Sequence, residues 1–223
     1  AGPWCRTPED KETDMLDGKA KESNMVRMTG EIVSEPCLVR EGRGEKLYMA
    51  YIQTRRISGV TDRIPLIIPG RLIGPGDCTG RMVSVEGQFR SYNRHGDGKS
   101  RLILSVFVKE FRLLETGWPV DCACNNQVFL DGFICKAPIY RKTPKGREIA
   151  DVILAVNRPH RKSDYIPCIV WGRDAWDVAR LDVGAALRIS GRIQSREYDK
   201  MLSETESETR VAYEVSAIEV GIG

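Results

Sequence analysis

The sequence predicts an all-β protein in which two similar five-stranded barrels follow one another along the chain. Two observations predict this fold class: an internal repeat of about a hundred residues, and short segments of β-type composition within each copy. A shift of 102 residues places Gly30 on Gly132 and Asp62 on Asp164. Because the repeat is this long, each copy is a domain and not the unit of a solenoid.

Each copy contains five segments in which apolar residues, many of them β-branched, alternate with polar ones. The expected strands are Val26–Val33, Leu47–Thr54, Ile64–Ile68, Met82–Arg90 and Leu102–Leu114, then Val128–Cys135, Ile149–Asn157, Tyr165–Trp171, Ala186–Arg196 and Arg210–Val220. A short helical slot lies between the third and fourth strand of each copy. This order is that of an OB-fold, so we predict two tandem OB-fold five-stranded barrels with a short helix between strands 3 and 4.

The helical slots differ between the copies. Residues 174–181 have helical character, and we expect Trp176 to pack into the core there. In the first copy the slot contains Gly74, Pro75 and Gly76, which favour a loop. The repeat shift grows to 104 at Gly87 and Gly191, where glycine inside a strand indicates a corner or a bulge.

The chain divides into four predicted regions. Residues 1–23 are polar and form a flexible arm, residues 24–117 form the first, degenerate OB-fold, residues 118–125 form a linker, and residues 126–223 form the second OB-fold. The linker is expected here because Gly117 and Pro119 end the fifth strand.

Charge is unevenly distributed among these regions. Residues 24–118 hold 15 basic and 10 acidic side chains, a balance of +5, whereas residues 1–23 hold 4 and 6 and residues 119–223 hold 15 and 15. The first barrel is therefore basic, which suits a polyanionic ligand.

Several function classes lack their sequence signals. No apolar run is long enough to span a bilayer and no secretion signal is present, so we expect a cytoplasmic protein. The seven scattered cysteines and two histidines predict neither a disulfide framework nor a metal site, and we expect no cofactor. No phosphate-binding loop, nucleophile elbow or zinc-protease motif occurs, so we expect no enzymatic activity. We interpret Asp164 as a cap on the turn before a strand, not as half of a catalytic pair.

Three segments carry a family resemblance. Ala150-Asp-Val-Ile-Leu-Ala-Val-Asn-Arg158, Asp164-Tyr-Ile-Pro-Cys-Ile-Val-Trp-Gly172 and Gly191-Arg-Ile-Gln-Ser-Arg196 resemble the bacterial single-stranded-DNA-binding (SSB) family, here in a tandem two-OB-fold variant. The first copy keeps a thinner version of the pattern. The resemblance implies sequence-tolerant binding of single-stranded DNA in replication, recombination or repair, through base stacking and a basic track.

Candidate stacking residues follow from this resemblance and from strand geometry. Tyr165 and Trp171 are six residues apart and so share one face of a strand. Their positions and that of Tyr198 match those where the family places DNA-stacking aromatics. The alternative is that Trp171 belongs to the core and Tyr198 to a hairpin. The first copy has Arg63, Pro69 and Arg94 at the equivalent positions, which leaves Tyr92 as its nearest aromatic.

Basic loops and strands supply the candidate phosphate contacts. In the second copy these are Arg141, Lys142, Lys145, Arg147, Arg158, His160, Arg161, Lys162, Arg173 and Arg196; in the first copy they are Arg55, Arg56, Arg63, Arg90, Arg94, Lys99 and Arg101. Solvated loops are the alternative in both copies. The first barrel would then serve to position or dimerise the protein.

The expected partners are single-stranded DNA and a second copy of the chain. Family members with two barrels per chain pair as dimers, and the first strands Val26–Val33 and Val128–Cys135 have the β-branched composition to pair between chains. This sequence ends after its fifth strand, so we expect no acidic tail that recruits other proteins. Because no apolar run is long enough to span a bilayer, we also expect no membrane partner. The alternative function is an OB-fold protein-interaction or accessory module with weak nucleic-acid binding.

Overall fold

A computed structural model describes residues 22–42, 44–73, 78–96, 99–115, 121–201 and 207–223, without the side chains of residues 94–96, 99, 100 and 160. Almost all of the predicted arm and much of the predicted linker lie outside these ranges, so both remain predictions. No helix within the ranges has the length and apolar character needed to cross a membrane.

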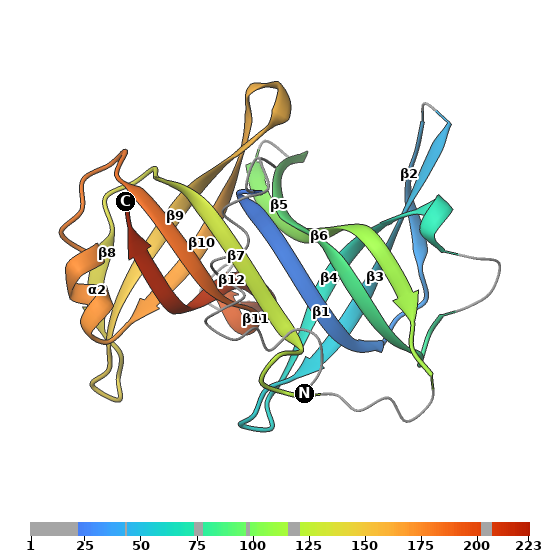
Figure 1. Ribbon diagram of the computed structural model, residues 1–223, viewed down its shortest axis with the longest axis horizontal. Helices are drawn as coiled ribbons and strands as arrows, with labels where there is room; N and C mark the ends of the chain where they lie inside the picture. Colours follow the sequence, from blue (N-terminus) through green and yellow to red (C-terminus); the bar gives the residue numbers. More distant parts are fainter. Residues whose placement is uncertain (1–21, 43, 74–77, 97–98, 116–120, 202–206) are drawn as a thin grey trace, which may run out of the picture.

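The described chain is almost entirely β-structure (Figure 1). The first copy consists of β1 (Asn24–Ile32), β2 (Cys37–Gly42), β3 (Glu45–Arg55), β4 (Thr61–Pro69), the 3-10 turn η1 (Gly70–Leu72), β5 (Met82–Gly96) and β6 (Lys99–Leu113). The second consists of β7 (Asn126–Ile134), β8 (Ile139–Lys142), β9 (Glu148–Arg158), the 3-10 turn η2 (Pro159–Arg161), β10 (Lys162–Trp171), α2 (Arg173–Val178), β11 (Ala186–Met201) and β12 (Ser207–Ile222).

The strand order shows two closed barrels joined into one sheet. It runs β2-β3-β4-β6-β5-β1-β7-β11-β12-β10-β9-β8, and the extra pairings β3–β1 and β7–β9 close each barrel on itself. Within each barrel one pair is parallel, β4 with β6 and β10 with β12, and the neighbouring pairs are antiparallel. The predicted fold class, all-β with two tandem OB-folds, is confirmed.

The barrels meet where β1 and β7 pair antiparallel at the centre of the molecule (Figure 1). Val26 lies opposite Val128, its own counterpart under the 102-residue shift, so the seam is symmetric. The expectation that the first strands pair between chains is therefore wrong. The edge of β1 that would be free for a second chain pairs with β7 of the same chain, and the same holds for β7. The backbone hydrogen bonds of an edge strand can be made only once.

The alternation that predicted the strands is the alternation of burial. β1 and β7 show the same pattern, in which every second side chain from Asn24 and from Asn126 points into a barrel. Val26, Met28, Val128 and Leu130 are each no more than 3% exposed and belong to one hydrophobic core cluster that extends through both barrels. Burial of these apolar faces is the main stabilising contribution to such a sheet.

Glycine is required at the bulges of β5 and β11. The strand register shifts at Gly87 and at Gly191, as predicted. A Cβ atom at these positions would lie 2.2 Å from the Phe107 carbonyl oxygen and 2.3 Å from the Ser216 carbonyl oxygen. These contacts are with backbone atoms, so only glycine allows the close approach of the two strands.

Helix α2 differs from the prediction in its length and in the place of Trp176. The helix covers six residues and buries only Ala175 and Val178. Trp176 is 52% exposed, so the expectation of core packing is wrong. Its ring stands edge-on to Tyr140 with a centroid separation of 5.6 Å, and the Arg180 guanidinium lies 5.3 Å from its centroid. A helix this short has one narrow buried side, and Trp176 falls outside it.

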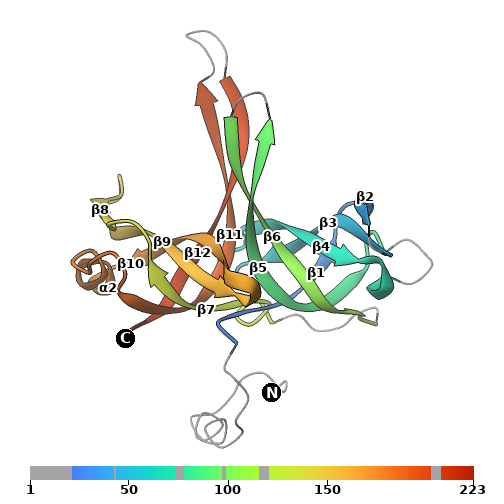
Figure 2. The ribbon, with the colours of Figure 1, turned by 90° about the horizontal axis from the view of Figure 1, so that it is seen from above.

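Two further features were absent from the predicted strands. β2 and β8 are short outer strands, and the hairpins β5–β6 and β11–β12 extend well past the expected strand ends. Figure 2 shows both hairpins projecting side by side from one side of the molecule. They bring residues of each barrel against the other barrel.

Candidate nucleic-acid interface

Strand β10 places the two predicted stacking residues on its outward face. Its inward side chains, from Asp164 to Val170, are buried. Tyr165 is 46% exposed and Trp171 is partly buried. Six residues of extended strand span about 20 Å, so the rings are two separate contacts along one strand.

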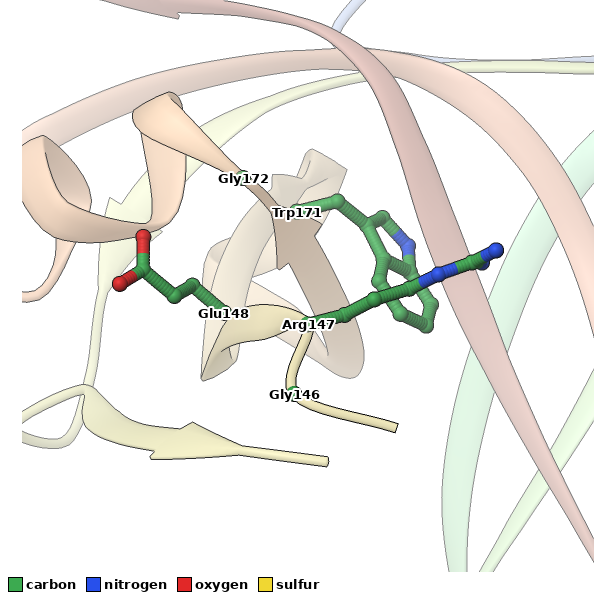
Figure 3. Close-up of a pocket in the computed structure, with 5 residues that line it drawn as sticks. All are labelled: Gly146, Arg147, Glu148, Trp171 and Gly172. Atoms are coloured by element: carbon green, nitrogen blue, oxygen red, sulfur yellow. The ribbon is translucent and has the colours of Figure 1, made fainter. Parts of the chain in front are cut away.

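Trp171 forms a wall of an open pocket of about 430 Å³ together with Gly146, Arg147, Glu148 and Gly172. Its indole Nε1 donates a hydrogen bond to Ser216 Oγ at 3.0 Å, which fixes the ring orientation. In Figure 3 the side chains of Trp171 and Arg147 extend the same way and Glu148 extends the opposite way. The pocket thus offers a flat aromatic wall beside one cation, a combination that suits a base and its phosphate.

Tyr165 sits beside a cationic turn at the other end of β10. Arg161 and Lys162 are both exposed, and Arg161 has a φ of 57°, a left-handed conformation that is uncommon outside glycine. The Tyr165 backbone N–H donates to Ser91 Oγ at 2.8 Å, and Ser91 belongs to the first barrel. The other barrel therefore helps to hold this platform in place.

Tyr198 lies on the projecting part of β11 and is 38% exposed. The Arg196 guanidinium lies 5.8 Å from its ring centroid, within the range of a cation–π contact. Arg196 is also 3.8 Å from the Glu214 carboxylate. The hairpin thus presents an aromatic ring and a cation together.

The predicted phosphate contacts of the second barrel divide into paired and unpaired cations. Arg141 is held by Asp151 and Lys142 lies 3.6 Å from Glu148. His160 lies outside the described side chains. Among the described residues no ion pair engages the exposed side chains Lys145, Arg147, Arg161, Lys162 and Arg173. These five cations are the ones free to meet a phosphate.

Arg158 has a different position, because it faces the fully buried Asp164 across 3.1 Å. Asp164 lies inside β10, where its Oδ1 accepts the backbone N–H of Ser91 in the first barrel at 2.6 Å. It therefore joins the barrels and does not cap a turn, contrary to the sequence interpretation. Burial raises the pKa of Asp164, and the Ser91 N–H and the nearby Arg158 oppose this shift. Arg158 Nε and Asp164 Oδ2 lack hydrogen-bond partners within the described structure.

An equivalent junction with better geometry joins the barrels on the other side. Arg56 makes two hydrogen bonds to the buried Asp62, of 2.7 and 2.6 Å, and the bond to Asp62 raises the pKa of Arg56. Asp62 Oδ1 also accepts the backbone N–H of Ser195 in the second barrel at 2.8 Å. No three His, Cys, Asp or Glu side chains in the described part of the chain group closely enough to hold a metal ion.

The outward face of β4 carries different chemistry from that of β10. Arg63 is exposed, and its guanidinium lies 5.5 Å from the ring centroid of Tyr51 on β3. Pro69 is buried, whereas Tyr92 is 49% exposed on the β5 hairpin. Tyr51 is not among the contacts predicted from the sequence: its equivalent in the second copy is Ile153, so the repeat does not mark it.

The remaining first-barrel candidates are dispersed. Arg55 and Arg101 are exposed, and Arg90 lies 4.1 Å from the Phe107 centroid. Burial, together with the nearby Arg158, lowers the pKa of Arg90. The side chains of Arg94 and Lys99 lie outside the described residues.

Comparison with known proteins finds a matching family model for the second barrel. A model of the single-strand binding protein family matches residues 125–220. The second barrel is similar to this family over these residues, which are less than half of the chain. The single-stranded DNA-binding protein of Halalkalibacterium halodurans is 42% identical over 81 residues, which are 33% of this chain and 48% of that protein. Single-stranded DNA-binding protein A of Bacillus subtilis is 36% identical over 96 residues, 40% of this chain and 56% of that protein.

The chain therefore spans about half the length of the curated relatives it matches. The match to the single-strand binding protein family includes Tyr165, Trp171 and Tyr198, whereas the whole first barrel lies outside it. The likeness of fold extends further. The solved single-stranded DNA binding protein of Thermus aquaticus superposes with a TM-score of 0.69 at 22% identity, covering 92% of this chain and 94% of that one.

Proposed function

We propose that this chain binds single-stranded DNA without strong sequence preference and protects it during replication, recombination or repair. The observation that carries the proposal is the outward face of β10. It presents Tyr165 and Trp171, with exposed cations at both ends that no carboxylate among the described residues pairs. Bases stack on aromatic rings whatever their identity, and cations neutralise phosphates.

Each contact has a proposed role. A base stacks on Tyr165 while Arg161 and Lys162 meet phosphates. Another base enters the Trp171 pocket beside Arg147, and Lys145 on the same loop meets a phosphate outside the pocket. Tyr198 with Arg196 extends the track along the hairpin, and Arg173 and Tyr92 are further contacts. Arg56 and Arg158 are left out of the track, because buried carboxylates already engage them.

The test is a titration of the full chain with oligo(dT) and with duplex DNA at two salt concentrations. We expect tight binding of the single strand, weaker binding of the duplex and strong quenching of tryptophan fluorescence. Trp171→Phe removes most of the quenching but keeps a ring for stacking, whereas Trp176→Phe, the control outside the track, leaves the quenching intact. Equal affinity for duplex and single strand, or no binding, overturns the proposal.

The proposal includes a homodimer as the functional unit. Met25 and Phe129 lie opposite each other across the β1–β7 seam on its outward side, and Phe133 nearby is 46% exposed. A second copy packed on this face would shield the three side chains and bring four barrels together. Light scattering should give about twice the chain mass of 25.1 kDa, and Phe129→Asp should give the monomer. A monomeric parent at micromolar concentration contradicts this part alone.

The proposed activity is binding without catalysis, and it needs no cofactor. A cytoplasmic location is part of the same proposal. The alternative is an interaction module with weak nucleic-acid binding. It predicts a low affinity for oligo(dT) that substitutions on β10 do not change.

A further inference from the structure

A cluster of side chains from both barrels forms beside Arg63. Tyr51 on β3 and Arg63 on β4 are diagonal neighbours on one face of the first barrel, since Gln53 pairs with Arg63 and Tyr51 with Pro65. The third member, Tyr213, comes from β12 of the second barrel. It lies opposite Ser195, whose Oγ accepts the Arg63 backbone N–H at 3.2 Å.

Two interactions join the members of this Arg63 cluster, meaning Tyr51, Arg63 and Tyr213. The Arg63 guanidinium lies 5.5 Å from the Tyr51 centroid. Burial, the proximity of Tyr51 and a hydrogen bond to its hydroxyl raise the pKa of Tyr213 to about 12, while Arg63 and Arg101 act in the opposite direction. The side chain of Arg63 remains exposed, and no carboxylate pairs it within the described residues. Arg101 on β6 is exposed as well.

The equivalent positions in the second barrel hold an aromatic residue where the cluster has its cation, and aliphatic residues where the cluster has its tyrosines. There Tyr165 occupies the Arg63 position, Ile153 the Tyr51 position and Leu104, opposite Ser91, the Tyr213 position. One site has an aromatic ring on aliphatic support, and the other has a guanidinium on aromatic support. Both of these groups are flat, and nucleic-acid-binding proteins stack bases on either kind.

We propose that the Arg63 cluster is a second contact for single-stranded nucleic acid, in which a base stacks on the Arg63 guanidinium and Arg101 meets a phosphate. The Tyr51 ring contacts the guanidinium and holds it in place, so less conformational freedom is lost on binding. This inference rests on the proposed function. It extends the track onto the first barrel, which lacks the aromatic residues of β10.

The first experiment separates stacking from charge. Arg63→Lys keeps the charge and loses the plane, so the affinity for oligo(dT) should fall about 5-fold or more with an unchanged salt dependence. Arg63→Gln should cause a similar loss and also flatten the slope of log affinity against log salt by roughly 0.7. If Arg63→Lys binds as well as the parent, the stacking role is overturned. Arg112→Gln, which removes an exposed first-barrel cation paired with Glu110, is the control and should have little effect.

The second experiment tests the support. Tyr51→Phe and Tyr213→Phe keep the rings and should bind nearly as well as the parent, whereas Tyr51→Leu should weaken binding. If both Phe variants weaken binding as much as Tyr51→Leu, the hydroxyl bond alone matters and the proposed support is wrong. Thermal unfolding of each variant verifies the fold, and should Tyr51→Leu not fold, the Lys and Phe variants decide the question.

A direct readout is photo-cross-linking of the parent with oligo(dT) that contains 5-iododeoxyuridine, followed by mass spectrometry. A cross-linked peptide that contains Tyr51, Arg63 or Tyr213 supports the cluster. Cross-links confined to second-barrel peptides that lack Tyr213 overturn it while leaving the proposed function intact. Absence of any binding by the parent overturns both proposals.

Discussion

The second barrel carries Tyr165 and Trp171 on the outward face of β10, whereas the equivalent positions of β4 in the first barrel carry Arg63 and Pro69. The scaffold around these positions has stayed the same. Both barrels keep an Arg–Asp pair, the bulge glycine and a serine that reaches the other barrel. Residues that shape the barrel and its junction are thus retained in both copies, while residues that would face a ligand differ.

The two junctions differ in quality as well. Asp62 accepts two hydrogen bonds from Arg56. In the other junction, Arg158 Nε and Asp164 Oδ2 both lack a hydrogen-bond partner in the described structure. A buried carboxylate is stabilised only when its partners satisfy it. The first junction should therefore contribute more to the stability of the chain than the second.

The largest expected effect compares the two ligand faces. Tyr165→Ala combined with Trp171→Ala should weaken oligo(dT) binding by about 2–5 kcal/mol, because two stacking contacts are lost. Arg63→Ala should cost less, since it removes one contact. Fluorescence anisotropy with labelled oligo(dT) measures both. A folded double variant that binds like the parent would remove Tyr165 and Trp171 from the interface.

A smaller effect compares the junctions. Asp62→Asn leaves a partly buried Arg56 without its charged partner and should lower the free energy of unfolding by about 3 kcal/mol. Asp164→Asn keeps an oxygen to accept the Ser91 N–H and should cost about 1 kcal/mol. Urea unfolding measures both changes, and equal losses would show that the difference in geometry has no energetic consequence.

The smallest effect is a pH dependence. The pKa of Asp164 is raised in the folded state, so the folded chain holds this proton more tightly than the unfolded chain does. The resulting stabilisation is complete below the ordinary value of 3.8 and is lost as the pH rises through the raised pKa. The stability of the parent relative to Asp164→Asn should therefore decrease over that window, measured by urea unfolding. A constant difference argues against a raised pKa, and Asp177→Asn on the exposed side of α2 is the control.

The sequence by itself determined the repeat and the barrels. Alternating burial along β1 and β7 follows directly from their residues, and the 102-residue shift aligns the two barrels residue by residue. The outward placement of Tyr165 and Trp171 follows from the two-residue period of a strand. These properties are local, and a local pattern is enough to predict them.

The tertiary structure decided which segments meet. Pairing of β1 with β7 within the chain, the Ser91 and Ser195 contacts across the barrels and the approach of Tyr213 to Tyr51 all join residues at least 70 positions apart. The exposure of Trp176 likewise depends on how α2 lies against β9 and β10. No periodicity encodes such contacts, because they arise from the symmetric packing of two barrels that the repeat can only suggest.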